Sequence, residues 1–432
     1  MSNMLIKRIR LLTSTTALLL LVACATAAPA PEYLKEGDWK TRITSQEKDG
    51  IKISAAVPSA KESKALFGKP LYKQDIQPVW LEIQNNKPFP ISFLPVGLDP
   101  SYYTPLEVAN TDLKDKNGNA KLVDEFFLSQ GMGALKVMPG EIRSGFVFSK
   151  LDEGTKAFNV DIIGSVRDAN ADNYFETFTF FIPVPGLNID HYNVNWKELY
   201  SDDEWVDLDK DRLIERLEQS PCCVTDKKGV GSGDPINLVI IGKPIDIYTA
   251  FIRAGWDETE TVTRTSSMKT IASFLSGGEY RYSPISGLYV FGRAQDVAFQ
   301  KARDNIHERN HLRLWMSPAR FNGEPVFLGQ ISRDIGVRFT RKTITTHKID
   351  PDVDETREYL LENLAYSQSL KQFAYVKGVG EVPITQPKGN LTGDPWFTDG
   401  YRIVLWVTSE PRPIDEIELL RWRIPDMSKR NK

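Results

Sequence analysis

The sequence has few of the residues on which strong functional motifs depend. Its 432 residues include three cysteines and four histidines. It contains no G-x-S-x-G elbow, no P-loop and no G-x-G-x-x-G fingerprint, and these are the signatures of α/β-hydrolases, P-loop NTPases and dinucleotide-binding enzymes. The zincin motif, with two histidines and a glutamate on one helix, is also absent. No familiar enzyme class is therefore indicated by a motif.

After the first 23 residues, the sequence has neither an excess of positive charge nor a long apolar run. Lys and Arg number 54 against 57 Asp and Glu, and without the first 23 residues the basic count falls to 51. A nucleic-acid binder would need a basic patch or a high isoelectric point, so we expect no nucleic-acid partner. No later apolar run approaches the roughly 20 residues of a membrane-spanning helix. We therefore expect a membrane to hold only the N-terminus.

The N-terminus has the three parts of an export signal. A basic start is followed by a largely apolar stretch at residues 11–22, and Ala23 precedes Cys24. A cysteine directly after a small residue at this place resembles the lipobox of bacterial lipoproteins. The resemblance implies that residues 1–23 are a signal peptide and that Cys24 becomes lipidated, with diacylglycerol on its thiol and an acyl chain such as palmitate on its amino group. The alternative is an ordinary cleaved signal followed by a free cysteine.

Lipidation implies a location as well as an anchor. Several acyl chains make attachment effectively permanent. In the lipoprotein family an Asp after the lipidated cysteine favours retention in the inner membrane, and this chain has Ala25. We therefore expect a cell-envelope protein, on the outer membrane where the cell has one, with its body in the periplasm or another extracytoplasmic space.

Turn residues and apolar patterns divide the rest of the chain. Short strand-like runs with little helix, apart from residues 58–66, predict an all-β, immunoglobulin-like sandwich in the first domain. The second domain mixes a buried strand at 236–241, a helix at 245–254 and a helix starting at Asp350, which predicts an α+β fold. The expected segments are a tether at 24–37, the sandwich at 38–185, a connector at 186–233, the α+β domain at 234–410 and a C-terminal tail at 411–432.

The second domain resembles the LssY C-terminal domain family. Five blocks in order carry the resemblance: residues 237–239 with 255–256, residues 288–301, residues 309–315, residues 332–336, and residues 347–354 with Arg357. The family often has a second histidine where this chain has Asn310. Its domains resemble accessory regions that accompany membrane proteins of the phosphatidic acid phosphatase type. This resemblance implies that the domain occurs near such proteins, but it implies no reaction mechanism.

One strand of this domain carries candidate binding residues. In the run 311–316, His311, Arg313 and Trp315 alternate with apolar residues, so the three side chains share one face. A titratable ring, a fixed cation and an aromatic ring predict an anion- or sugar-binding surface. Asp334 follows the next strand, and His347 lies near a strand end just before an acidic cluster.

These residues suggest a catalytic hypothesis with a structural alternative. The catalytic candidates are His311, Arg313, Asp334 and His347, and the candidate ligands of a divalent metal are His311, His347, Asp350 and Asp352. The stronger alternative is that Asp350, followed by proline, is a helix N-cap and that the acids after it complement the helix dipole. His307 is four residues before His311, but the strand pattern makes that spacing weak, and His191 lies in the connector.

The two cysteines that lipid would not consume are adjacent. Cys222 and Cys223 can form a vicinal disulfide, remain as two thiols, or link to another chain. Two thiols alone do not make a zinc site, which wants three or four ligands.

Two functional hypotheses follow. The favoured one is a non-enzymatic envelope lipoprotein whose second domain binds an envelope protein or a phosphate-containing ligand. The alternative is a metal-assisted hydrolase of a phosphate-containing envelope substrate. Convergence in space of His311, His347 and Asp334 at an open cleft would favour the hydrolase.

Replacing Cys24 tests the anchor. A Cys24→Ser chain expressed in a bacterial host should incorporate no labelled fatty acid and should leave the membrane fraction, because the acyl chains supply the attachment. Unchanged labelling or unchanged membrane association in this variant would contradict the lipobox prediction.

Overall fold

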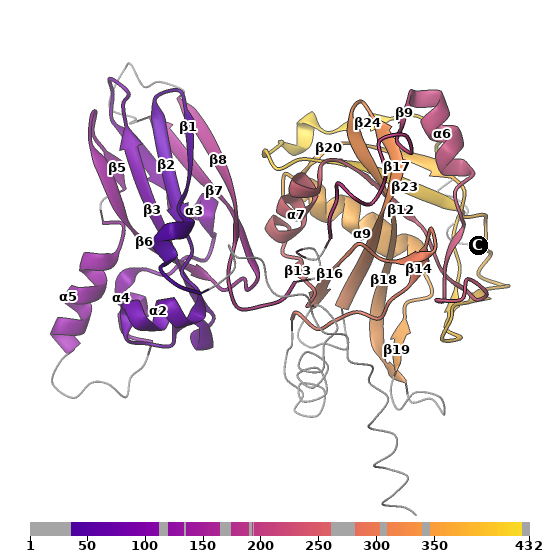
Figure 1. Cartoon of the computed structure of the whole chain (residues 1–432), viewed down its shortest axis with the longest axis horizontal. Helices are drawn as coiled ribbons and strands as arrows, with labels where there is room; N and C mark the ends of the chain where they lie inside the picture. The colour runs from indigo at the N-terminus through magenta and orange to yellow at the C-terminus, as the bar shows by residue number, and fades with distance from the viewer. Residues whose placement is uncertain are drawn as a thin grey trace, which may run out of the picture.

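The computed structural model shows two bodies side by side (Figure 1). It describes residues 36–111, 120–133, 135–164, 174–189, 192, 194–260, 281–302, 309–338 and 346–425, without the side chains of 337–338 and 346–347. Cys24, the predicted signal peptide, His191 and His307 lie outside these residues. The chain is α+β and richer in strand than in helix, as predicted.

The first body contains two four-stranded antiparallel sheets among the described residues. Alternate side chains of their strands meet in one apolar core, which includes Ile53, Leu81, Phe93, Val160 and Phe180. Burial of every second residue is what a sheet with one covered face requires. In order across each sheet, the strands are β1 (Thr44–Lys48), β2 (Ile51–Ala56), β3 (Ile76–Asn85) and β6 (Ile142–Lys150), and β5 (Lys136–Val137), β4 (Ile91–Leu94), β7 (Thr155–Gly164) and β8 (Phe175–Pro183).

The first body has more helix than the sequence predicts. The helix expected at 58–66 is α2 (Ala60–Phe67), capped by Ser59 and ended by Gly68 at φ 69°. Three further helices, α3 (Pro95–Leu98), α4 (Pro105–Ala109) and α5 (Ala120–Gln130), were not predicted. Phe127 of α5 is buried in a second cluster with α2 and α4, whereas Phe126 is 39% exposed.

The second body is built on one mixed sheet of ten strands within the described part of the chain. Its main path is β13-β16-β17-β18-β12-β23-β20-β24, with β19 beside β18 and β9 beside β17. The strands are β9 (Val206–Leu208), β12 (Leu238–Ile241), β13 (Asp257–Glu258), β16 (Val297–Ala302), β17 (Arg309–Phe321), β18 (Glu324–Arg338), β19 (Thr346–Ile349), β20 (Leu370–Lys377), β23 (Tyr401–Val407) and β24 (Glu418–Leu420).

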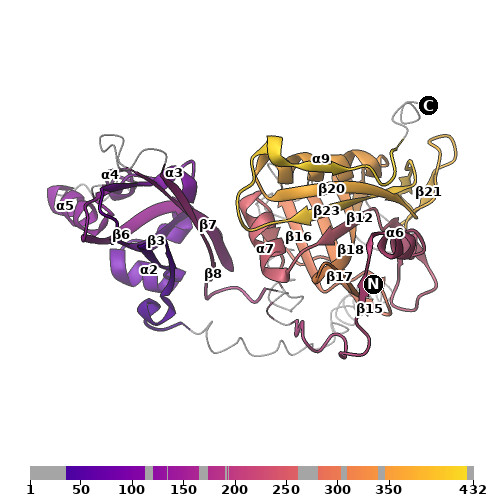
Figure 2. The same cartoon turned by 90° about the horizontal axis from the view of Figure 1, so that it is seen from above.

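Both faces of this sheet are covered. Helices α7 (Pro244–Arg253) and α9 (Val353–Tyr366) pack on one face, where Phe251 and Leu360 join Leu314 in a core. Helix α6 (Lys210–Glu218) packs on the other, where Leu217 joins Trp315. Figure 2 shows α7 and α6 on opposite sides of the strands of this sheet. Burial from both sides explains the continuous apolar run of β12.

Two segments predicted to lie between or beyond the domains are part of the second body. The predicted connector contributes β9, which pairs with β17, and α6, whose Leu213, Ile214 and Leu217 are buried. It also contributes β10 (Cys223–Thr225) and β11 (Ser232–Pro235) to a small sheet with β14 (Tyr289–Val290) and β15 (Arg293–Ala294). The predicted tail contributes β24, which pairs in parallel with β20. The second body therefore starts before residue 234 and continues past residue 410.

Hydrogen bonds also join the two bodies. The backbone N–H of Glu153 donates to the Tyr282 hydroxyl at 2.8 Å, and the Thr179 hydroxyl donates to the Ser409 carbonyl at 3.2 Å. No described helix is long and apolar enough to span a membrane.

The contribution of the C-terminal segment can be measured. The ring of Trp422 lies 5.2 Å from that of Trp406 and 6.4 Å from that of Phe321. A Trp422→Ala variant should lose about 1–3 kcal/mol of unfolding free energy in urea, because it removes these aromatic contacts. Ile424→Ala is the matched control, since Ile424 is 71% exposed. Equal stability of the two variants would mean that the segment is a dispensable tail.

Candidate functional site

The histidine strand β17 has the predicted alternation but not the predicted exposure. Leu312 and Leu314 face the core under α7 and α9, and Trp315 belongs to the core on the opposite face. His311 is 8% exposed and Arg313 is 4% exposed. The prediction of an open binding surface here is therefore wrong, because the second face of the sheet is covered as well.

His311 and Asp334 do come together inside this face. The strand register places His311 opposite Ser332 on β18. The His311 Nδ1 atom lies 3.5 Å from the Asp334 carboxylate, and its Nε2 lies 3.0 Å from the Ser332 hydroxyl. Arg309 contacts the same carboxylate at 3.3 Å. Burial raises the pKa of Asp334 to about 7, and the attraction of Arg309 opposes that rise.

Arg313 is held by neutral groups. Its guanidinium donates to the Gln330 side-chain oxygen at 2.9 Å and to the Ser286 carbonyl at 3.2 Å. Burial lowers its pKa to about 10. Asn310, at the position where the family often has histidine, accepts a bond from Arg333 at 3.0 Å. The guanidinium of Arg313, one of the catalytic candidates, is therefore occupied by protein groups.

The other metal candidates have different partners, or a side chain that the structure does not describe. The backbone of His347 pairs with Val337 in β19, but the His347 side chain is not described. Asp352 is the N-cap of α9 and accepts from two backbone N–H groups, while Asp350 accepts from the backbone N–H of Asp352. The predicted aspartate cap exists, but it is Asp352 and not Asp350. No three His, Cys, Asp or Glu side chains are grouped as a metal site among the described residues.

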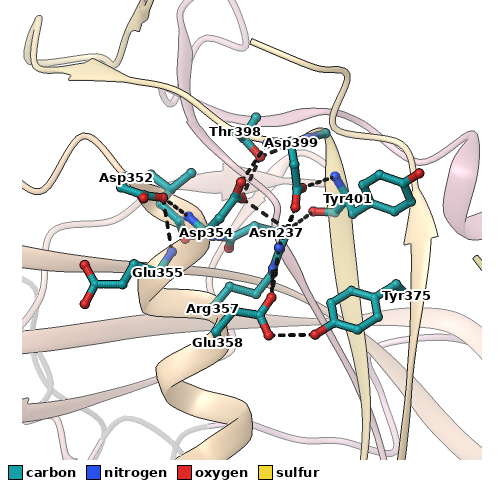
Figure 3. Close-up of polar contacts among 12 residues, drawn as sticks. Asn237, Asp352, Asp354, Glu355, Arg357, Glu358, Tyr375, Thr398, Asp399 and Tyr401 are labelled. Carbon is teal, nitrogen blue, oxygen red and sulfur yellow. Dashed lines mark hydrogen bonds and ion pairs between the residues drawn. The ribbon is translucent and has the colours of Figure 1, made fainter. Parts of the chain in front are cut away.

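A network of charged residues lies at the start of α9, around Arg357 (Figure 3). The Arg357 guanidinium is fully buried and donates hydrogen bonds to both carboxylate oxygens of Asp399, at 3.0 and 2.9 Å. It also lies 3.1 Å from the Asp354 carboxylate and 2.9 Å from that of Glu358. A bidentate pair of this kind restricts geometry as well as adding energy. We call Asp354, Arg357, Glu358 and Asp399 the Arg357 network.

The Arg357 network joins α9 to the turn before β23. Asp354 accepts from the Thr398 hydroxyl at 2.7 Å and from the backbone N–H of Asp399 at 2.6 Å. Burial raises the pKa of Asp354 to about 6, against the opposing effect of Arg357. Directly before β12, the Asn237 amide donates to the Val353 carbonyl at 3.1 Å. Hydrogen bonds and ion pairs therefore connect α9, the turn before β23 and the start of the central strand β12.

Beside the Arg357 network lies a cavity of about 890 Å³. A volume of this size suits a small-molecule ligand. Three glycines lie in its wall, and Gly400 has no room for a Cβ, which would meet the Glu381 nitrogen at 2.6 Å. The lining residues are Asp352, Asp354, Lys377, Gly378, Val379, Gly380, Glu381, Val382, Pro383, Ile384, Phe397, Thr398, Asp399, Gly400 and Tyr401.

The sequence only partly anticipates this site. The sequence points to Asp352, but as a metal ligand or as part of a helix cap. It includes Arg357 in a block of the family resemblance, but it assigns that residue no role. Trp396 is 1% exposed, whereas its neighbour Phe397 lines the cavity. The turn residues Asp394–Gly400, which precede a strand, are the sequence feature that could have indicated this site. Cys222 and Cys223, left open by the sequence, form a vicinal disulfide.

A family model described as LssY C-terminus matches residues 214–401. The second body therefore carries an LssY C-terminal domain, and the resemblance predicted from five sequence blocks is confirmed. The match starts inside α6, within the predicted connector, and ends at the first residue of β23. Both the histidine cluster and the Arg357 network fall within it. No curated protein matches the chain.

Removing the cation of the Arg357 network should be strongly destabilising. Replacing Arg357 by Met leaves buried carboxylates without their cation, and we expect the unfolding free energy to fall by about 3–5 kcal/mol in urea titrations. Arg412→Met is the matched control, because that arginine forms an exposed pair with Glu416 and should cost at most about 1 kcal/mol. Similar losses in both variants would contradict the network.

Asp334 should give stability a measurable dependence on pH. Its pKa is about 7 in the folded chain, against an ordinary value of 3.8, so the folded state binds more protons between these values. Stability should therefore fall as the pH rises through that window. In an Asp334→Asn variant, urea titrations at several pH values should show a smaller fall than in the parent chain. Parallel curves for the two proteins would contradict the raised pKa.

Proposed function

We propose that this protein is a lipid-anchored envelope lipoprotein whose LssY C-terminal domain is a binding module. The observation that carries the proposal is the cavity of about 890 Å³ set against the rigid Arg357 network. A preformed concave site held by buried ion pairs needs little ordering when a ligand enters, and preorganisation of this kind favours binding.

The lining of the cavity favours a particular ligand chemistry. It supplies carboxylates from Asp352 and Asp399, the aromatic residues Phe397 and Tyr401, and only one cation among the lining residues, Lys377. Carboxylates accept hydrogen bonds and repel anions. A ligand rich in hydroxyl groups, such as an envelope saccharide, fits this lining better than one rich in phosphate.

The first body has a supporting role in this proposal. Its two sheets share one core, as they would in the immunoglobulin-like sandwich that the sequence predicts. Such a sandwich between the anchored end and the binding domain would act as a spacer or contact module in the envelope.

One observation favours the alternative, a metal-assisted hydrolase of a phosphate-containing envelope substrate. His311 and Asp334 lie 3.5 Å apart, with Arg309 on the same carboxylate. The cluster is buried, however, and Arg313 donates to protein groups.

Mass spectrometry tests this alternative by measuring the metal content of the Cys24→Ser chain and of the same chain with His311→Ala and His347→Ala. About one tightly held zinc or manganese ion per chain, lost in the derivative, would favour the hydrolase.

Calorimetric titration with a soluble saccharide tests the binding module. We expect the tetramer of N-acetylglucosamine to bind the Cys24→Ser chain, and inorganic phosphate not to bind. Tyr401→Ala should weaken saccharide binding by about tenfold, or ~1.4 kcal/mol, because an aromatic wall is lost.

Tyr366→Ala is the matched control, since Tyr366 is 87% exposed at the far end of α9 and is not a lining residue. Equal loss of affinity in the two variants would remove the cavity as the binding site. Phosphate binding without saccharide binding would overturn the ligand chemistry and favour the hydrolase.

A further inference from the structure

The vicinal disulfide lies between two elements of the LssY C-terminal domain. Cys222 and Cys223 follow helix α6, and Cys223 begins strand β10. The Cys222 carbonyl accepts from the backbone N–H of Ile236 at 2.8 Å. Both cysteines are half-buried, so a small reagent in solution can reach them.

A buried arginine ties this segment to the wall of the cavity. The Arg402 side chain is fully buried and donates to the carbonyls of Ser220 at 2.9 Å and Pro221 at 2.6 Å, directly before the cysteines. The same guanidinium donates to the Gly378 carbonyl at 3.1 Å, and Gly378 lines the cavity. One side chain therefore holds the cysteine segment and the cavity wall together.

The end of α6 also lies directly against the cavity wall. A Cβ on Gly378 would meet the Leu217 carbonyl oxygen at 3.0 Å and that of Glu218 at 3.1 Å. The backbone N–H of Lys377 donates to the Glu218 carboxylate at 3.3 Å. Little space separates the two segments, so a shift of the backbone after α6 is transmitted to Gly378.

Cys223 contacts the cavity wall from a second direction. It packs on an apolar cluster that contains Val379 and Val382, which line the cavity, and the lining residue Phe397 packs on the same cluster. The disulfide closes a small ring through the backbone of two adjacent residues, which removes rotational freedom from that backbone. The wall is therefore supported by a segment whose freedom depends on one covalent bond.

We propose that the redox state of Cys222 and Cys223 regulates the cavity. The inference rests on the proposed function, because it assumes that the cavity is the binding site. A dithiol reductant attacks one sulfur, the S–S bond breaks, and a mixed disulfide forms. The second thiol of the reductant then releases the cysteine as a thiol. In total, two cysteine thiols and one oxidised reductant result. The oxidised pair holds the cavity in its binding shape, and the reduced pair loosens its wall.

Hydrogen–deuterium exchange on the Cys24→Ser chain tests this without any ligand. The intact mass should first rise by about 2 Da on treatment with dithiothreitol, as reduction of one disulfide requires. Amides of residues 378–384 and 396–401 should then exchange at least about threefold faster in the reduced protein, because local opening becomes easier. Amides of β12 are the internal control and should not change.

A Cys222→Ser/Cys223→Ser variant of the same chain should show the faster exchange with or without dithiothreitol. If that variant fails to fold, the comparison of oxidised and reduced parent protein still decides. An unchanged mass on reduction, or equal exchange of the cavity wall in both states, would overturn the proposal. Because no saccharide is used, failure here is distinguishable from failure of the binding proposal.

Discussion

The ion pair of Arg357 with Asp399 is the constraint on which the candidate site depends. It places a fully buried guanidinium against a carboxylate from a turn that follows it by 42 residues. The pair is not by itself strong evidence for stability, since desolvation of buried charges offsets much of their attraction. Its effect is geometric, because it requires α9 and the turn before β23 to keep one relative position. The cavity lies against these two elements, so its shape follows from the same pair.

Local patterns predict much of the fold. The helix α7 follows from an apolar stretch ended by Gly255, and the alternation of β17 follows from residues 311–316. Helix α5 was not predicted, because its two phenylalanines are adjacent in sequence, which is not the spacing of one helix face, and only Phe127 is buried. The extent of the second body was also missed, since the pairing of β24 with β20 joins segments far apart in sequence.

The sequence predicted some residues of the site, but not how they are arranged in space. His311 and Asp334 were candidates whose convergence the sequence left open, and the structure brings them together. Their burial depends on what covers the second face of the sheet, which periodicity in one strand does not reveal. The role of Arg357 depends on a distant partner, Asp399. The vicinal disulfide illustrates the same limit, because its place beside the cavity wall arises from Arg402, 179 residues after Cys223.

The central strand β12 has a consequence for how the chain folds. Its neighbours are β18 and β23, and Leu238 pairs with Gly329 on one side and with Ile403 on the other. A newly made chain therefore carries β12 for some 165 residues before the second partner exists. Pairings across such sequence separations form late and slowly. Until β23 arrives, β12 has an unpaired apolar edge that can associate with other chains, so chaperone protection during this interval would matter more for this protein than for one built of local hairpins.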